Sequence, residues 1–364
     1  MPEFMPGLQL SEIFFQETIK PLLAANYPGL TYSAARLGWG SDVMGFDTPM
    51  SMDHGWGPKI TLFLAEDAYS DLHKQLPDFF TWNLPFQIRG FPINFGEPYE
   101  DGGIMEAKTT YPLHHMVTIT TPERYFLDYL GFDIHQTMTA ATWLTLPQQR
   151  LRTIRSGDIF HDGLGVVSET KQKLHWYPHD LWLYLMANQW RRIDQEEPFI
   201  GRTGIVEDEL GSRLIAARLV QESMCLSFLM EKVYTPYSKW FGSAFQRLLL
   251  APQLTSIFSH ILDSQNWKER EAHLCQAYLA LTDAHNQLDV TQEIKQDISN
   301  FHNRPFLVPH SSRFVEALLE KIQDPEVKAL SPHLGSIDQY IISVDVLTNI
   351  PLLSRLRYLY ESQN

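Results

Sequence analysis

Residues 37–58 read LGWGSDVMGFDTPMSMDHGWGP and separate two segments that have the pattern of β-strands. Before them, residues 30–37 form a short apolar run that predicts a strand. After them, residues 59–64 (KITLFL) are apolar and β-branched enough to form a buried strand. The connecting stretch is rich in Gly, Asp and Pro, which are typical of loops. The sequence therefore predicts two strands joined by a long loop.

The first part of the chain mixes further strand and helix patterns. Residues 116–120 (MVTIT) alternate cleanly and predict another strand, and residues 86–91 are a further strand candidate. Residues 11–25 place apolar side chains on one face and predict a helix that Pro21 kinks or splits. We therefore expect an α+β domain with a mixed sheet over residues 6–135.

The second part of the chain is helical in pattern, and we expect a mostly helical domain over residues 136–364. Only residues 164–167 and the segment around Leu174 suggest extended structure there. The predicted helices cover residues 139–154, 179–192, 208–232, 239–250, 267–284 and 312–322.

Composition limits the possible environments and partners. The 364 residues carry a formal net charge of −14, so the average surface repels a nucleic-acid backbone and we expect no nucleic-acid partner. Two cysteines, Cys225 and Cys275, cannot make a disulfide framework or a structural zinc site. We recognise no signal peptide and no membrane span, and expect a cytoplasmic protein.

The glycine-rich loop does not fit the common nucleotide-binding motifs. The pair Gly38 and Gly40 suggests a dinucleotide-binding turn, but the third glycine of that motif would fall at Val43. The loop also lacks the Gly-Lys-Ser/Thr sequence that ends a Walker A motif. Another arrangement fits better. Gly40 and Ser41 can offer backbone N–H groups and a hydroxyl to a phosphate, and acidic residues farther along can hold a Mg²⁺ ion that bridges phosphate oxygens.

This order of Gly-Ser, spacer, acid and apolar strand resembles the nucleotidyltransferase superfamily, which includes the kanamycin-type enzymes. The resemblance is closer to a large uncharacterised family of nucleotidyltransferase-like proteins, and it extends to about Asn286. It implies a mixed-sheet core followed by a helical domain, with the substrate in a cleft between them. The segments that carry it are residues 40–48, 51–58, 125–133, 189–192, 208–212 and 237–242.

The sequence departs from the superfamily at two of its three metal-site acids. The superfamily has two carboxylates one residue apart on the second strand; here Asp53 is followed two residues later by Gly55. Its third carboxylate, on a later strand, corresponds to Thr118. One carboxylate of the three is therefore retained. Asp47 and Asp42 lie nearby and could serve as ligands, although Asp47 is also a natural turn residue and Asp53 could cap a turn.

Several functional hypotheses remain open. In the first, Asp53 and Asp47 hold Mg²⁺ and act in catalysis, Gly40 and Ser41 bind the phosphates of a nucleotide, and a small-molecule acceptor receives the nucleotidyl group. Arg191 and Lys239 of the helical part would make further phosphate contacts. In the second, the fold has lost catalysis and acts as a binding module. In the third, the cleft has been rebuilt for other chemistry.

Overall fold

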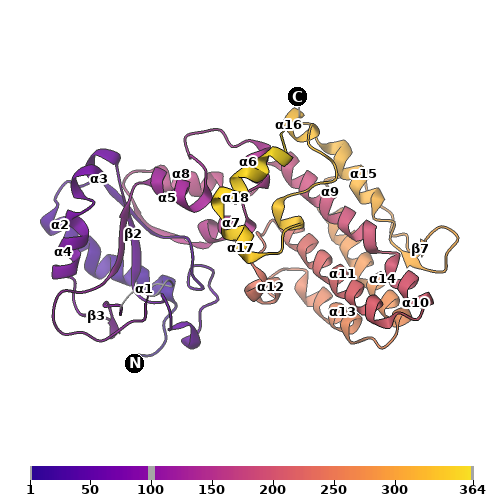
Figure 1. The fold of residues 1–364 in the computed structure, drawn as a ribbon, viewed down its shortest axis with the longest axis horizontal. Helices are drawn as coiled ribbons and strands as arrows, with labels where there is room; N and C mark the ends of the chain where they lie inside the picture. Colours follow the sequence, from indigo (N-terminus) through magenta and orange to yellow (C-terminus); the bar gives the residue numbers. More distant parts are fainter. Residues whose placement is uncertain (1, 97–102, 362–364) are drawn as a thin grey trace. The chain divides into compact units, whose positions relative to one another are not determined.

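The computed structural model describes residues 2–96 and 103–361, and the chain divides into two compact units (Figure 1). The first unit comprises Met1–Thr137 and Arg150–His175, and the second comprises Met138–Gln149 and Trp176–Asn364. The predicted domain boundary at residue 135 lies close to Thr137, where the chain first passes from the first unit into the second. Residues 150–175, which we expected in the helical part, instead return to the first unit.

A four-stranded mixed sheet forms the centre of the first unit, with the strand order β5-β2-β1-β6. β1 runs antiparallel to both β2 and β6, whereas β2 and β5 are parallel. The strands are β1 (Tyr32–Arg36), β2 (Lys59–Leu64), β5 (Met116–Thr120) and β6 (Asp158–Asp162). The predictions of β1, β2 and β5 are confirmed, whereas β6 was not predicted.

The extended structure that we predicted at residues 164–167 is wrong, because α8 (Val166–Lys173) begins there. The carboxylate of Asp162 accepts hydrogen bonds from the backbone N–H groups of Gly165 and Ser168, at 3.0 and 2.9 Å. Gly165 adopts a left-handed conformation with φ of +78°. These contacts satisfy N–H groups at the start of the helix and allow the chain to turn from β6 directly into α8.

Residues 86–91, predicted as one strand, form a hairpin of β3 (Gln87–Ile88) and β4 (Phe91–Pro92). The reason is local: Arg89 and Gly90 both have positive φ, +50° and +84°. Two consecutive residues in that region make a tight turn that reverses the chain.

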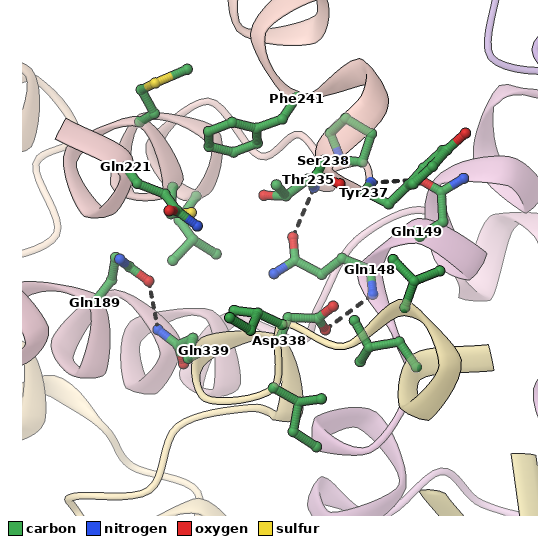
Figure 2. A pocket seen from close by; sticks show the side chains of 18 of the residues that line it. Gln148, Gln149, Gln189, Gln221, Thr235, Tyr237, Ser238, Phe241, Asp338 and Gln339 are labelled. Atoms are coloured by element: carbon green, nitrogen blue, oxygen red, sulfur yellow. Dashed lines mark hydrogen bonds between the residues drawn. The ribbon is translucent and has the colours of Figure 1, made fainter. Parts of the chain in front are cut away.

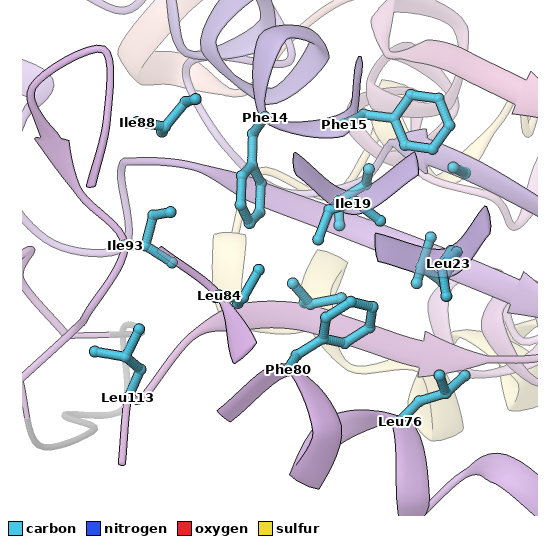
Figure 3. Packing of buried hydrophobic residues seen from close by; sticks show 14 of the residues in the cluster. Phe14, Phe15, Ile19, Leu23, Leu76, Phe80, Leu84, Ile88, Ile93 and Leu113 are labelled. Atoms are coloured by element: carbon cyan, nitrogen blue, oxygen red, sulfur yellow. The ribbon is translucent and has the colours of Figure 1, made fainter. Parts of the chain in front are cut away.

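The N-terminal helices and helix α4 (Gln75–Asn83) cover one face of the sheet (Figure 3). The single helix that we predicted is instead α1 (Gly7–Phe14), a π-helical turn η1 (Phe15–Ile19) and α2 (Lys20–Asn26), with Pro21 in the first turn of α2. Proline lacks an N–H group and disrupts the regular hydrogen-bond pattern before it, consistent with the π turn at this point. Phe14, Phe15 and Phe80 are fully buried in this layer.

A buried ion pair holds the loop that follows β1. The guanidinium of Arg36 donates from Nε to Oδ2 of Asp42 at 2.8 Å and from Nη2 to Oδ1 at 2.9 Å. It also donates to the backbone oxygens of Leu37 and Trp39, at 3.0 and 2.7 Å. A Cβ on Gly40, whose φ is +143°, would lie 1.9 Å from Oδ1 of Asp42. The loop conformation therefore depends on this ion pair and on glycine at position 40.

The other helical elements of the first unit flank the sheet and the loops. They are η2 (Pro49–Ser51), α3 (Glu66–Leu72), α5 (Pro122–Leu130) and the larger part of α7 (Gln148–Ser156), which crosses from one unit into the other.

The second unit is mostly helical. Its main helices are α6 (Ala140–Leu144), α9 (His179–Glu196), α10 (Phe199–Ile205), α11 (Glu209–Met230), α12 (Ser238–Phe245), α13 (Ala251–Asp263), α14 (Trp267–Gln287) and α15 (Ser312–Lys321). Short elements follow or interrupt them: β7 (Ser299–Asn300), β8 (Leu307–Val308), α16 (Pro325–Lys328), η3 (Ile337–Gln339), α17 (Val344–Thr348), α18 (Ile350–Arg355) and η4 (Leu356–Leu359).

The core of this unit is built from large apolar side chains on long helices. Trp190 of α9 is fully buried and stacks on Phe314 of α15, with ring centroids 4.0 Å apart. The helix that we predicted over residues 139–154 is two helices, α6 and α7, separated at Pro147. Among the described helices, none has both the length and the apolar character needed to cross a membrane. The α+β class, a mixed-sheet region followed by a helical region, is confirmed.

Replacement of Gly40 by alanine tests the loop constraint. The added methyl group collides with the Arg36–Asp42 pair and forces a strained φ, so we expect the variant to lose about 3 kcal/mol or more of unfolding free energy. Urea denaturation followed by tryptophan fluorescence measures this loss.

Gly242→Ala is the matched control, because a Cβ on this helical glycine meets nothing within 4 Å. We expect it to be neutral or to stabilise the protein by up to about 1 kcal/mol. Equal stabilities for the Gly40 and Gly242 variants would contradict the role of the ion pair.

Glu197 makes the stability of the second unit depend on pH. The residue is 5% exposed, and burial raises the pKa of its carboxyl group to about 7, although the backbone N–H of Ser311 donates a hydrogen bond to that group. The folded state therefore holds a proton that the unfolded state releases at a lower pH. The contribution of Glu197 to stability is present below the unfolded pKa of 4.5 and is lost as pH rises toward 7.

Glu197→Gln keeps the shape of the side chain and removes this titration. Between about pH 4.5 and 7, we expect wild type to lose up to about 3 kcal/mol relative to the variant. Urea titrations across this range measure the difference. Parallel stability profiles for the two proteins would show that Glu197 does not titrate with a raised pKa.

Candidate functional site

A cavity of about 220 Å³ lies within the first unit, beside the ends of β1, β2 and β5. Thr61 of β2 is the register partner of Thr118 of β5. Because side chains alternate between the faces of a strand, Lys59 lies on the same face as Thr61. The cavity is lined by Lys59, Thr61 and Thr118, by Arg36 and residues 37–39 after β1, and by Tyr125 and Tyr129 of α5. A lysine and two threonine hydroxyls thus share one wall.

Lys59 supplies the cavity with a positive charge. The side chain is half-buried, and within residues 2–96 and 103–361 no partner hydrogen-bonds or ion-pairs with its ammonium group. Burial and, to a smaller extent, the charge of Arg36 lower its pKa to about 8, against the opposite effect of Asp42. The ammonium group is therefore still mostly protonated at neutral pH, at a place where a bound anion would stabilise it.

Tyr125 adds a hydrogen-bond donor without an acceptor. Its hydroxyl is buried and has no partner among the described residues. The ring is held between Tyr129, at a centroid distance of 5.8 Å, and Phe63, at 5.2 Å. The hydroxyl of Tyr129 instead bonds to that of Thr153 at 2.6 Å. Since an unsatisfied buried polar group is costly, a ligand oxygen in the cavity would satisfy the Tyr125 hydroxyl.

Trp39 places an exposed aromatic surface beside the cavity. Its side chain is 46% exposed, although it contacts the ring of Tyr129 edge-on at 5.7 Å. The guanidinium of Arg150 lies 5.0 Å from the ring centroid of Trp39. A planar group of a ligand could stack on such a surface.

The two acids that we predicted as catalytic and metal-binding lie in different environments. Oδ2 of Asp47 accepts hydrogen bonds from the backbone N–H of Gly7 at 2.7 Å and from Nε1 of Trp56 at 2.9 Å. Asp47 thus ties the start of α1 to the loop. Asp53 is exposed and lies in the turn that precedes β2, not on the strand.

The acids considered as magnesium ligands, Asp42, Asp47 and Asp53, are not gathered into one group of three among the described residues. Asp42, the other acid considered as a ligand, is bound on both oxygens by Arg36. Across the part of the chain that the structure describes, no three His, Cys, Asp or Glu side chains come together as a metal-binding group. Gly55 is also not on β2, and the β2 positions that share a face with Thr118 are Lys59, Thr61 and Phe63. That face of the strand therefore presents a lysine and no acid.

Gly40 and Ser41, predicted to contact phosphate, follow the segment that lines the cavity. The need for glycine at position 40 is explained by the Arg36–Asp42 pair, because a Cβ there would also lie 2.5 Å from Nη2 of Arg36. Ser41 is half-buried, and its backbone oxygen accepts a hydrogen bond from Phe46 at 2.9 Å. Their contact with a ligand stays a prediction.

The predicted phosphate contacts from the helical part, Arg191 and Lys239, belong to the second unit. Lys239 is exposed at the start of α12, with its ammonium group 5.0 Å from the ring centroid of Trp240. Arg191 lies on α9 with its Nε buried and unpaired within the described residues. Their roles also stay predictions.

Sequence reasoning missed Lys59, Thr61, Trp39 and Tyr125 as candidate site residues. The segment 59–64 was recognised as a buried strand, but its polar residues at alternate positions were not considered further. A lysine and a threonine that share one face of a predicted interior strand are a detectable signal, because a polar pair on a buried strand needs a partner or a ligand.

Comparisons with known proteins find a family match over part of the chain and a distant structural similarity. Residues 143–241 match a family described as a domain of unknown function (DUF4037). No curated protein matches the chain. Among solved structures, a nucleotidyltransferase-like protein from Exiguobacterium sibiricum 255-15 is similar, with 10% sequence identity and a TM-score of 0.31. The alignment covers 81% of this chain and 82% of that protein.

Proposed function

We propose that this chain is a nucleotidyltransferase-like protein that binds a phosphorylated small molecule, with a nucleotide as the favoured class, in the cavity beside β2 and β5. The observation that carries the proposal is the half-buried ammonium group of Lys59, which lines the cavity with Thr61 and Thr118. A phosphate oxygen can accept hydrogen bonds from an ammonium group and from hydroxyls together.

The donors around Lys59 suit an anion bound without a metal. Arg36 also lines the cavity, with its charge paired to Asp42, and the unpaired hydroxyl of Tyr125 adds a neutral donor. Trp39 offers its exposed ring to the base of a nucleotide. The ammonium group of Lys59 would repel a magnesium ion placed beside it, and it can instead neutralise the charge of a phosphate directly.

This arrangement favours the binding-module hypothesis over magnesium-dependent nucleotidyl transfer. Transfer in the resembled superfamily uses carboxylates for metal binding and for activating the acceptor. Here Gly55 and Thr118 stand at two of those positions, and the residues that line the cavity include no acid. A threonine does not accept a proton near neutral pH. The net charge of −14 also favours a small ligand in a local cationic cavity over a nucleic-acid polymer.

Lys59→Gln tests the proposed anion contact. We expect wild type to bind ATP or inorganic pyrophosphate in buffer containing EDTA, and the variant to bind about tenfold more weakly because a charge-assisted hydrogen bond is lost. Isothermal titration calorimetry with and without Mg²⁺ measures both affinities.

Two control variants separate this proposal from the metal-dependent one. Lys74→Gln removes an exposed lysine that does not line the cavity, and Asp53→Asn removes the carboxylate predicted for magnesium. We expect both to bind like wild type. Binding that requires Mg²⁺ and is lost in Asp53→Asn would overturn the proposal, as would the absence of binding to any nucleoside triphosphate by folded protein.

The lowered pKa of Lys59 gives a second prediction. At pH 8, near its pKa of about 8, the free protein holds this proton in roughly half of the molecules. A bound phosphate raises the pKa of Lys59, so binding takes up roughly half a proton, and affinity falls as pH rises through 8. The other titratable cavity groups stay protonated there, because Arg36 is a guanidinium and burial raises the pKa of Tyr125 and Tyr129.

Calorimetry at pH 8 in buffers of different ionisation enthalpy measures the proton uptake. The uptake should disappear in Lys59→Gln and persist in Lys74→Gln. An equal uptake in wild type and Lys59→Gln would show that another group takes up the proton and would contradict the placement of the anion at Lys59.

A further inference from the structure

A second cavity, of about 370 Å³, lies within the helical unit (Figure 2). Its walls come from the start of α7, from α9 and α11, from residues 235–241, and from the C-terminal segment at 338–347. Its volume is within the range of small-molecule sites in proteins. The function proposed for the first unit makes no use of it.

The polar part of the wall consists mainly of side-chain amides held in fixed orientations. The oxygen of Gln148 accepts a hydrogen bond from the backbone N–H of Thr235 at 2.9 Å, and that of Gln149 accepts one from Tyr237 at 3.0 Å. Across the cavity, Nε2 of Gln339 donates to the oxygen of Gln189 at 2.9 Å (Figure 2). These bonds connect the walls to one another and preorganise the cavity.

Asp338 brings a carboxylate into this wall without a cation beside it. The backbone N–H of Gln148 donates to its Oδ2 at 3.1 Å (Figure 2). None of the described residues that line the cavity is Lys, Arg or His, and no described cation forms an ion pair with Asp338. Burial raises the pKa of Asp338 to about 7, as expected for a carboxylate that lacks a counter-ion.

The rest of the wall is apolar. Val220 and Met224 of α11, Phe241 of α12 and Ile342 of the C-terminal segment line it. A ligand for this cavity therefore needs a hydrogen-bond donor with positive charge at one end and an apolar body at the other.

We propose that the cavity of the helical unit binds a small organic cation, in which an amidinium, guanidinium or ammonium group pairs with Asp338 and an apolar body contacts the α11 and α12 walls. A carboxylate has about four lone-pair positions, and a planar pair of N–H groups matches two of them in parallel. The fixed amides of Gln148 and Gln339 keep the wall polar around this group. The site is independent of the phosphate site proposed in the first unit.

Binding of benzamidine to the full-length protein tests the proposal, with benzamide as its neutral isostere and benzoate as its anionic one. Titration calorimetry and ligand-observed NMR measure the affinities. We expect benzamidine to bind, and benzamide and benzoate to bind at least about tenfold more weakly, since neither supplies a positive charge to Asp338. This comparison needs no variant, so it does not depend on how a substitution folds.

Asp338→Asn should weaken benzamidine binding by roughly thirtyfold or more. Asp345→Asn is the matched control, because Asp345 is exposed on α17 in the same C-terminal segment and does not line the cavity. It should bind like wild type. The proposal is overturned if benzamidine, phenethylamine and agmatine all fail to bind wild type, or if Asp338→Asn, folded by circular dichroism, binds benzamidine undiminished.

Discussion

The buried pair of Arg36 and Asp42 is the interaction on which the first unit's candidate site depends. It ties the last residue of β1 to the loop behind it, and it also holds the backbone oxygens of Leu37 and Trp39. Removing one partner would leave an uncompensated buried charge, so the pair fixes the conformation of the loop. The residues that line the cavity after β1 are therefore preorganised before any ligand arrives.

Two acids of this loop make structural contacts. Asp42 is saturated by Arg36, and Asp47 joins Gly7 to the indole of Trp56. Neither lines the cavity, whose β2 and β5 wall presents a lysine ammonium group and threonine hydroxyls. In a chain of net charge −14, this local cationic wall is the feature that a small anion would recognise.

Regular patterns in the sequence predicted the α+β class, three strands of the main sheet and most of the long helices, because alternation and helical periodicity are local properties. The sequence did not predict β6, because Asp158 and Asp162 at its ends leave too short an apolar run to indicate a strand. Its pairing with β1 is also a long-range contact, which a local pattern does not reveal. The glycine-rich loop was recognised as informative, but the partner of each acid could not be known. Arg36 and Trp56 engage Asp42 and Asp47 through tertiary structure that no spacing encodes. The second cavity escaped notice for the same reason, since Asp338 and Gln148 are far apart in the chain.

The central proposal is that Lys59, and not a metal ion, is the phosphate-binding group beside β2. A crystal structure of the protein with ATP in the presence of EDTA tests this most directly. We expect electron density for a phosphate group within hydrogen-bond distance of the Lys59 ammonium group, with the Tyr125 hydroxyl as a further donor and no metal between them. Phosphate density located instead at Asp53, or appearing only when Mg²⁺ is added and bridged by that ion, would contradict it.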